Sequence, residues 1–283
     1  ALKKVPFVVV ADNLMTSTAL YADLVLPVTT IFEDTSLMAG TRSHYIQLME
    51  KAVEPPGEAK PDYWIFAQLA KRFGFGEAFD KPIEELIETC LEGTGVTLEQ
   101  LRKGPVKPVE TPYIPFKDGQ IRTSTGKAHF FVEEWKEKGY SPVVTYIQAE
   151  EFVKNKSSKL AKKYPLMAVQ YKLARSIHSS FSNLQWINEV HQNKPEVLIH
   201  LNDAKKRGIK NGDKVVVYND RGEHKAIAVV TCHIKEGIVA LQNGWWEQQG
   251  GSSSHVTNDK PEPLGFGQAC NNTLVEIRKE DRS

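Results

Sequence analysis

The stretch that decides the fold is residues 202–246, NDAKKRGIKNGDKVVVYNDRGEHKAIAVVTCHIKEGIVALQNGWW. Three short runs rich in β-branched residues follow one another here, at residues 214–218, 226–231 and 238–241. Turns that contain glycine separate the runs, which is typical of strands joined by tight connections. The stretch ends on Gly244, Trp245 and Trp246, just past the third strand. The pattern predicts part of a small β-barrel with large aromatic residues at its rim, and it leaves open what the mouth holds.

A turn of helix is expected immediately before these strands, over residues 204–207. Asn202 or Asp203 can cap it, and Gly208 can end it at positive φ. Further strands are expected on both sides, at residues 166–170, 197–200 and 274–277. The polar residues 155–163, with their lysines and serines, are the expected boundary between this region and the first half of the chain.

The first half of the chain reads as alternating strands and helices. Residues 5–10 are a continuous apolar run, typical of a buried parallel strand, and residues 24–26 are a second short strand. Residues 31–48 are irregular on paper. Helices are expected at residues 63–73, at residues 82–91, and after a capping box at residues 97–100.

The composition excludes some classes of partner. Lys and Arg number 36 and Asp and Glu number 35 in 283 residues, so charge gives no reason to expect binding to nucleic acid or to an anionic membrane. No apolar run approaches the ~18 residues of a membrane-spanning helix, so direct membrane insertion is not expected. The chain begins Ala-Leu-Lys-Lys without Met, and we expect it to be a piece of something longer or a processed chain.

A polar loop follows the strand at residues 166–170. Its candidate binding residues are Arg175, Ser176, His178, Ser179, Ser180 and Asn183. Such a set suits a pyrophosphate or a heterocycle with several hydrogen-bond acceptors. A loop that satisfies its own backbone has the same composition, since Ser and Asn often bond to nearby backbone groups. Trp245 and Trp246 are equally open between a stacking platform and packing at the barrel end.

Several other kinds of site are not encoded. No two of the eight histidines stand at H-x-x-x-H spacing, and none of the three cysteines belongs to a C-x-x-C pair. The sequence T-S-T-G-K at residues 123–127 lacks the spacing of a nucleotide-triphosphate loop. The G-x-S-x-G motif of hydrolases is absent.

The motifs of the second half occur in a characteristic order. They are Arg175-x-x-His178-Ser179, Asn183, Trp186, Asp203-Ala204, Arg207-Gly208-Ile209, Gly212-Asp213, Asn219-Asp220-Arg221-Gly222, Lys235-x-Gly237 and Gly244-Trp245. This order resembles the C-terminal molybdopterin-dinucleotide-binding domain of the dimethyl sulfoxide reductase family of molybdenum oxidoreductases. In the first half, VVVADN at residues 8–13 and YADLVLP at residues 21–27 look like an α/β segment of the same catalytic subunits.

The resemblance implies a fold and a division into domains. It implies an α/β segment in residues 1–155, followed by an all-β, double-psi six-stranded β-barrel of the aspartate-decarboxylase-like kind in residues 156–283. Members of the family hold molybdenum or tungsten between two molybdopterin guanine dinucleotides. A [4Fe-4S] cluster and the metal ligand are expected before residue 1, so no catalytic or metal-ligating residue is proposed in this chain.

The resemblance also implies which residues bind the cofactor. The loop at residues 178–180 and the turn at Gly244 and Trp245 face the pterins, and the segments around Asn258 and at residues 268–272 complete the mouth. The resulting candidates are Arg175, Ser176, His178, Ser179, Ser180, Asn183, Gly244, Trp245, Asn258, Gln268 and Asn272. Arg175 and backbone N–H groups suit the phosphates, while Ser, Gln and Asn suit the pterin edges.

The expected function is cofactor binding within an oxidoreductase that acts on a small oxidant such as a sulfoxide, an N-oxide or a sulfur oxyanion. The expected partners are the remainder of the catalytic subunit, an iron–sulfur electron-transfer subunit and a membrane anchor subunit. Two alternatives stay open. One is a stand-alone binding or assembly module without catalysis, and the other is a family member with a non-redox reaction such as hydration.

Overall fold

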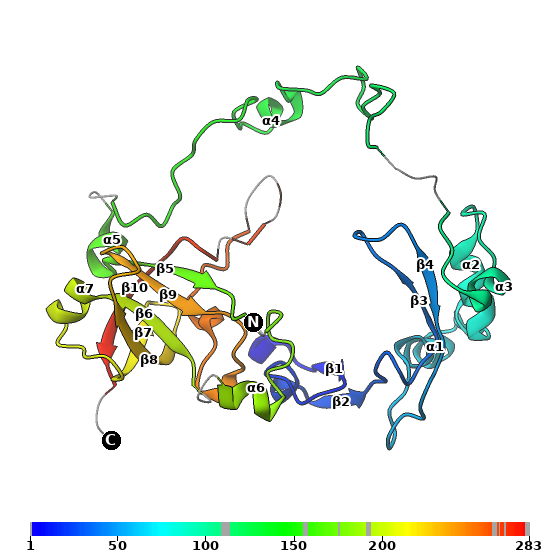
Figure 1. The fold of residues 1–283 in the computed structure, drawn as a ribbon, viewed down its shortest axis with the longest axis horizontal. Helices are drawn as coiled ribbons and strands as arrows, with labels where there is room; N and C mark the ends of the chain where they lie inside the picture. Colours follow the sequence, from blue (N-terminus) through cyan, green and yellow to red (C-terminus); the bar gives the residue numbers. More distant parts are fainter. Residues whose placement is uncertain are drawn as a thin grey trace. The chain divides into compact units, whose positions relative to one another are not determined.

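The computed structural model describes residues 2–108, 114–154, 158–174, 176–190, 194–261, 265, 267–268 and 270–280. The chain divides into two units, Ala1–Ala128 and His129–Ser283, and each is described by itself (Figure 1). The boundary predicted between residues 155 and 156 falls outside the described residues, so it stays a prediction.

The first unit opens with a small parallel sheet. Strand β1, Val9–Asp12, pairs with β2, Leu24–Pro27, and the short helix η2, Ala19–Tyr21, connects them. The predicted parallel pairing is confirmed. The predicted burial is wrong, because Val9 keeps 46% of its surface exposed and Val5 keeps 49%. A sheet of two strands offers too little area for another layer to cover.

The rest of the first unit is a hairpin with three helices. The hairpin pairs β3, Ser36–Ala39, with β4, Ile46–Met49, in a region that was expected to be irregular, so that expectation is wrong. Four-residue strands are too short to show an alternating pattern. Helices α1, Asp62–Arg72, α2, Ile83–Leu91, and α3, Leu98–Lys103, confirm the three predicted helices. Leu91, Leu98 and Leu101 are in the small core.

The α3 helix begins with the predicted capping box. The Thr97 hydroxyl accepts from the Gln100 N–H at 3.2 Å, and the Gln100 side chain accepts from the Thr97 N–H at 2.9 Å. The remaining short elements of the chain are η1, Leu2–Lys4, η3, Gly76–Ala78, α4, Glu133–Glu137, α5, Lys159–Lys163, α6, Gln185–Val190, η4, Glu247–Gln249, and η5, Ser253–His255.

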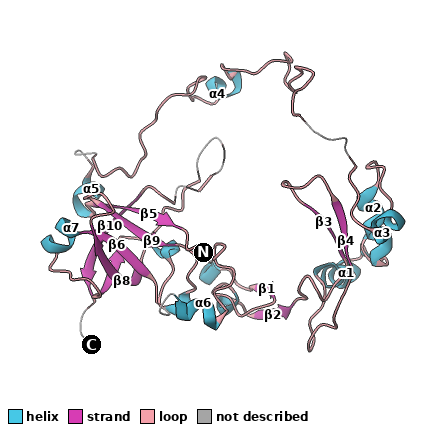
Figure 2. Ribbon diagram, viewed as in Figure 1, coloured by secondary structure: helices cyan, strands magenta, loops and turns pink. Residues whose placement is uncertain are grey.

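The second unit is built on a closed six-stranded barrel (Figure 2). Its strands are β5, Leu166–Tyr171, β6, Glu196–His200, β7, Lys214–Tyr218, β8, Glu223–Thr231, β9, Ile238–Gln242, and β10, Thr273–Lys279. They follow the order β10-β5-β9-β6-β8-β7 around the barrel, with parallel and antiparallel neighbours mixed. Every predicted strand is present, and the predicted fold class is confirmed.

Alternating valines, isoleucines, leucines and alanines fill the barrel. Val197, Val217, Ala228, Val239 and Val275 are all fully buried, each on a different strand. Side chains of successive residues point to opposite faces of a strand, so alternation along every strand lines a single interior.

The connections at residues 208–237 confirm the predicted turns and correct one cap. Gly208, Gly212 and Gly237 have φ of 66°, 84° and 84°, the left-handed values that favour glycine. Helix α7, Leu201–Lys206, is capped by the imidazole of His200, which accepts from the Asn202 N–H at 3.2 Å. The predicted cap at Asn202 or Asp203 is therefore wrong. The Asp203 carboxylate accepts from the Gly237 N–H instead, at 2.7 Å.

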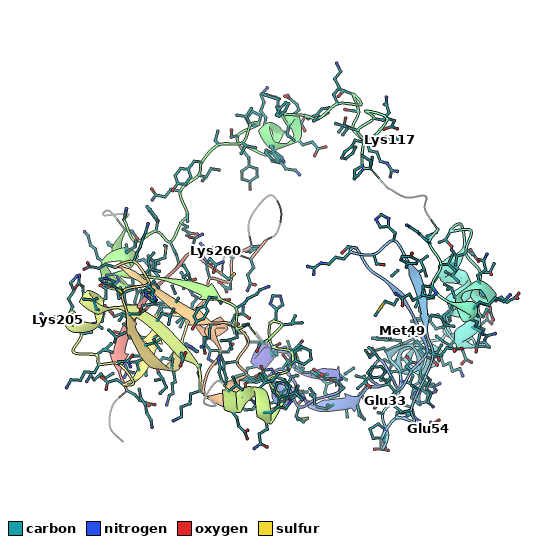
Figure 3. All side chains as sticks on the ribbon, viewed as in Figure 1. Glu33, Met49, Glu54, Lys117, Lys205 and Lys260 are labelled. Atoms are coloured by element: carbon teal, nitrogen blue, oxygen red, sulfur yellow. The ribbon has the colours of Figure 1, made fainter. Side chains whose placement is uncertain are left out.

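The directions of the strands define two different ends of the barrel. Strands β5, β7 and β9 run in one direction, and β6, β8 and β10 run in the other. We call the mouth the end where the first three strands finish and the last three begin. Helix α7 belongs to the opposite end, and Lys205 on it points away from the barrel (Figure 3).

Candidate functional site

The described candidate residues all lie in segments that meet at the mouth. Residues 176–183 follow β5, Gly244 and Trp245 follow β9, and Asn258 and Gln268 lie in the long connection from β9 to β10. Asn272 immediately precedes β10. Arg175 lies outside the described residues.

Gly244 holds the loop of residues 176–183 against the end of β9. Its φ is 102°, and a Cβ built on it would lie 1.9 Å from the carbonyl oxygen of His178, so only glycine fits. The Ser182 hydroxyl donates to the Gly244 carbonyl at 2.8 Å. The Trp246 indole N–H donates to the Ser179 carbonyl at 2.9 Å. Two segments far apart in the sequence are thereby joined backbone to backbone.

Two further side chains fix the same loop through one carbonyl. Gln249 donates to the Ser182 carbonyl at 2.6 Å, and Asn188 donates to it at 2.8 Å. His178 itself has a φ of 52°, which is uncommon outside glycine. The side chains of His178, Ser179, Ser180 and Asn183 are exposed. The loop therefore presents exposed polar side chains on a fixed backbone.

The two tryptophans have different environments. Trp245 keeps only 6% of its surface exposed, and its indole N–H donates to the Gln242 side chain at 2.8 Å. The same Gln242 oxygen accepts from the Glu196 N–H at 2.9 Å. Trp246 is half-buried against the loop. Trp245 is thus packed into the wall of the mouth, and Trp246 braces the loop.

A second group of candidates gathers at the start of β10. The Asn258 N–H donates to the Thr273 hydroxyl at 3.3 Å, and the Asn258 side chain is buried. Gln268 forms an isolated antiparallel bridge with Pro261. Asn272, next to Thr273, is exposed.

Gln170, near the end of β5, connects the two groups. Its N–H donates to the Asn271 side chain at 2.8 Å. Its side-chain oxygen accepts from Asn243, next to Gly244, at 2.9 Å. A chain of amide hydrogen bonds therefore runs across the mouth from one group to the other.

The sequence did not reveal a buried ion pair that supports the Asn258 segment. Arg221 donates two hydrogen bonds to the carboxylate of Glu151, at 2.7 and 3.1 Å, and Glu151 keeps 5% of its surface exposed. Arg221 also donates to the Val256 carbonyl at 3.0 Å, and Glu151 accepts from the Leu274 N–H at 2.7 Å. Arg221 belongs to the Asn219–Gly222 motif, but nothing near Glu151 marks it in the sequence.

His224 is the other residue that the sequence missed. It is fully buried near the start of β8, and neither ring nitrogen has a hydrogen-bond partner among the described residues. Burial, with a smaller contribution from His255, lowers the pKa of His224 to about 4. A usable signal existed, since His224 is in phase with Ala226 and Ala228, which face the interior.

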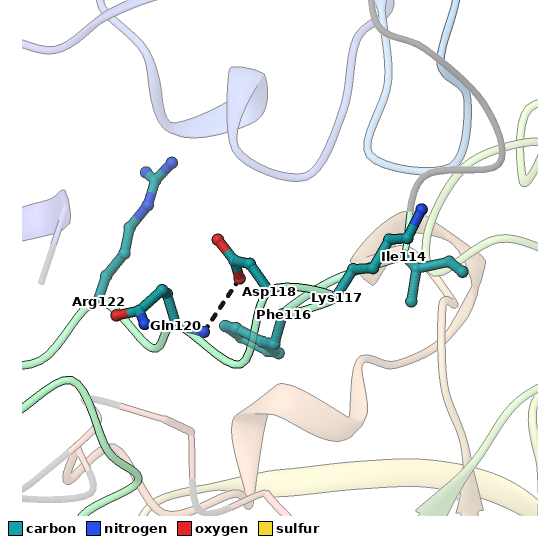
Figure 4. Close-up of a pocket in the computed structure, with 6 residues that line it drawn as sticks. All are labelled: Ile114, Phe116, Lys117, Asp118, Gln120 and Arg122. Carbon is teal, nitrogen blue, oxygen red and sulfur yellow. Dashed lines mark hydrogen bonds between the residues drawn. The ribbon is translucent and has the colours of Figure 1, made fainter.

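The first unit contains a hollow that shares no residue with the mouth (Figure 4). It is lined by Ile114, Phe116, Lys117, Asp118, Gln120 and Arg122, and the Gln120 N–H donates to Asp118 at 3.0 Å. A single stretch supplies every one of these residues, so the hollow is a bend in the chain and we give it no function. In the described parts of the chain, no group of three or more His, Cys, Asp or Glu could hold a metal ion. None of the described helices has the length and apolar character needed to cross a membrane.

Two family models match this chain in the order that the motifs indicate. The "Molybdopterin oxidoreductase" model matches residues 1–72, and the "Molydopterin dinucleotide binding domain" model matches residues 166–274, which include the barrel and the mouth. The chain belongs to the molybdopterin oxidoreductases. Its barrel is a molybdopterin dinucleotide-binding domain, and the mouth carries the connections of that domain.

Named relatives cover the whole chain. It is 35% identical to "Probable oxidoreductase YyaE" of Bacillus subtilis over 99% of this chain and 42% of the relative. It is 29% identical to "Dimethyl sulfoxide reductase DmsA" of Escherichia coli over 98% of this chain and 39% of the relative. The chain therefore spans about two fifths of the length of these relatives.

A solved structure agrees with the fold of nearly the entire chain. Acetylene hydratase from Pelobacter acetylenicus superposes with a TM-score of 0.80 at 25% identity, over 98% of this chain and 41% of that one. The likeness extends across both the first unit and the barrel.

Proposed function

We propose that the mouth binds molybdopterin guanine dinucleotide, in the bis form with molybdenum or tungsten. The chain then acts as the C-terminal cofactor-binding portion of an oxidoreductase catalytic subunit. The observation that carries the proposal is the fixed backbone contact between Gly244 and His178, inside the matched domain. It holds exposed donors from the β5 loop beside the end of β9.

The residues present fit such a cofactor. His178, Ser179, Ser180 and Asn183 offer donors and acceptors on one loop, and Asn272 and Gln268 offer amides near the start of β10. The absence of a side chain at Gly244 lets backbone approach backbone, as a tight binding turn requires. Arg175 and backbone N–H groups are the proposed partners of the phosphates.

The chain's own residues bind and orient the cofactor. When bound, the metal centre supplies the transfer of an oxygen atom or an electron pair. The proposed substrate is a small oxidant such as a sulfoxide, an N-oxide or a sulfur oxyanion. The names of the Escherichia coli relative, a dimethyl sulfoxide reductase, and of a Haemophilus influenzae relative, "Trimethylamine-N-oxide reductase", support this class.

The proposed partners follow from the same family membership. They are the remainder of the catalytic subunit, which would carry the metal ligand and a [4Fe-4S] cluster, an iron–sulfur electron-transfer subunit and a membrane anchor subunit. The name of a Halobacterium salinarum relative describes that protein as one catalytic subunit of a dimethyl sulfoxide reductase, which supports an assembly of several chains.

Metal and pterin analysis of the purified full-length subunit tests the proposal. We expect molybdenum or tungsten and two pterins per subunit, with reduced viologen oxidised on addition of dimethyl sulfoxide or trimethylamine N-oxide. A preparation without metal and without pterin would refute cofactor binding. A loaded preparation that transforms no substrate would favour the stand-alone binding or assembly module.

Hydration is a second candidate, because the superposed structure is an acetylene hydratase. A hydratase consumes water and no electrons, so it needs no electron-transfer partner. Incubation of the loaded subunit with acetylene, without an electron donor or acceptor, separates the candidates. Formation of acetaldehyde with no oxidation of viologen by sulfoxides would replace the redox proposal with hydration.

A further inference from the structure

His224 belongs to the interior layer of the barrel nearest the mouth. It is close to the start of β8 and pairs with Val217 of β7, which is fully buried. It shares the inward phase of Ala226 and Ala228, so its imidazole points into the barrel. The neighbouring inward positions of this strand are apolar.

The imidazole lacks what buried polar groups normally have. It is fully buried, and neither Nδ1 nor Nε2 has a hydrogen-bond partner among the described residues. Nearly all buried polar atoms in proteins are paired, so an exception calls for a partner outside the protein chain. A neutral imidazole can donate one hydrogen bond and accept one.

Only glycine backbone covers the ring on the side of Nδ1. A Cβ built on Gly251 would lie 2.9 Å from Nδ1 of His224 and 3.1 Å from the Lys225 carbonyl oxygen. Gly250 and Gly251 have φ of 106° and 155°, and no atom would meet a Cβ on Gly250. Two adjacent glycines can change conformation at low energetic cost. No side chain has to leave for a ligand to reach the ring beneath Gly251.

The covering segment is attached on both sides to the candidate cofactor site. Before it, Gln249 and Trp246 bond to the carbonyls of Ser182 and Ser179. After it, the chain continues through η5 to Asn258 at the start of β10. A ligand held by these two groups would lie over the segment that covers His224.

We propose that His224 is a further binding residue of the mouth, and that its Nδ1 forms a hydrogen bond with the lactam edge of a flat heterocycle. Guanine and pterin both present this edge, a carbonyl beside a ring N–H. The Gly250-Gly251 backbone moves aside when the heterocycle enters. This inference rests on the proposed function, because it assumes that the mouth takes the dinucleotide.

The ligand is a neutral edge and not a phosphate. The surroundings of the ring are the apolar interior, and a phosphate there would be left without a compensating cation. An uncharged lactam can enter the same place with one good hydrogen bond. His224 thus selects for a heterocycle, while the exposed loop residues remain available for the rest of the dinucleotide.

The test uses the 283-residue chain with two separate probes, GDP for the guanine source and neopterin for the pterin source. Binding is measured by calorimetry, and the ring nitrogens of His224 are followed by NMR. The variants are His224→Phe, which keeps the volume and removes the hydrogen bond, and His224→Gln, which keeps an acceptor and a donor. His233→Phe is the matched control, because His233 is exposed beyond the other end of the same strand.

We expect His224→Phe to weaken the binding of one probe about tenfold or more, the usual effect of losing one buried hydrogen bond. His224→Gln should recover part of the loss, and His233→Phe should bind as the wild type does. Without a probe, His224→Phe should melt at the same temperature as the wild type or higher, because it removes an unpaired polar group. The probe whose affinity changes identifies the source of the lactam.

Three results would overturn the inference. Equal binding of both probes by the wild type and His224→Phe would show that the ring does not contact the ligand. A lower melting temperature of ligand-free His224→Phe would show that a buried water already satisfies the ring. Failure of the wild type to bind either probe would refute cofactor binding at the mouth, and with it the role of His224.

Discussion

The two ends of the barrel solve opposite problems. At the opposite end, Asp203 is 4% exposed, yet it accepts from the Gly237 N–H at 2.7 Å and lies 3.7 Å from Arg207. Arg207 in turn donates to Glu276 at 2.5 and 3.1 Å. At the mouth, the buried His224 has no partner among the described residues, and two residues other than glycine, His178 and Phe181, have φ of 52° and 71°.

This difference separates stability from binding within one small fold. Every charge named at the opposite end is paired, which is what a purely structural site requires. The mouth retains backbone strain and an unpaired polar group, both of which concentrate where proteins bind ligands. Substitutions at the mouth should therefore change cofactor binding, and substitutions at the opposite end should change the free energy of unfolding alone.

The largest effect is expected for Gly244→Ala. The new Cβ would overlap the His178 carbonyl at 1.9 Å, and φ of 102° would strain it further. Overpacking and left-handed strain together cost up to about 5 kcal/mol. We expect the loop at residues 176–183 to detach, seen as fast hydrogen exchange, and cofactor content to fall to background. Gly237→Ala is the control, since it shares a positive φ of 84° with nothing within 4 Å, and it should retain the cofactor.

Acid should destabilise the barrel through His224. Burial lowers its folded-state pKa to about 4 from 6.5, so the unfolded state binds more protons between these values. Stability is therefore fully present above pH 6.5, falls as the pH decreases, and is reduced by about 3 kcal/mol below pH 4. Denaturant titrations of the wild type and His224→Phe between pH 7 and pH 4 measure this loss. Parallel curves for the two proteins would contradict it.

Asp203→Ala tests the opposite end. The substitution leaves the buried Gly237 N–H without its acceptor and removes a carboxylate beside Arg207. We expect the free energy of unfolding to fall by about 2 kcal/mol while cofactor content stays unchanged. Lys206→Ala is the control, because its ion pairs are exposed and should contribute less than about 1 kcal/mol. Loss of cofactor from a folded Asp203→Ala protein would show that the two ends are not independent.

The smallest effect is expected for Trp246→Phe. Phenylalanine preserves the ring packing but removes the N–H that donates to the Ser179 carbonyl at 2.9 Å. The loss of one such bond costs about 1 kcal/mol, and it should weaken cofactor retention slightly without unfolding the barrel. Trp186→Phe, at a ring that is 60% exposed, should leave retention unchanged. If both variants retain the cofactor as the wild type does, Trp246 has no bracing role.

The barrel could be predicted because its signals are local. Glycines at 208, 212 and 237 announce turns that need positive φ, and runs such as KVVVY announce strands whichever partner they pair with. The hairpin of β3 and β4 could not be predicted, because each strand has four residues and gains its identity from pairing. The cap of α7 was misplaced because an imidazole rarely takes the role of an Asp or Asn side chain.

The candidate site was predictable as a list of residues but not as an arrangement. The sequence named Gly244 and His178 separately, and only the fold shows one backbone resting on the other. Glu151 lies 70 residues before Arg221, so no local pattern could join them. His224 was overlooked since the expected strand began at residue 226, although the strand begins at Glu223.

The closure of the barrel by β10 has a consequence during synthesis. Strand β10, Thr273–Lys279, pairs with both β5 and β7, which are otherwise the two edges of the sheet β5-β9-β6-β8-β7. Until Thr273–Lys279 has left the ribosome, the nascent chain carries two open strand edges, and such edges recruit other chains. The barrel becomes safe from aggregation, and its mouth becomes complete, in the same translational step.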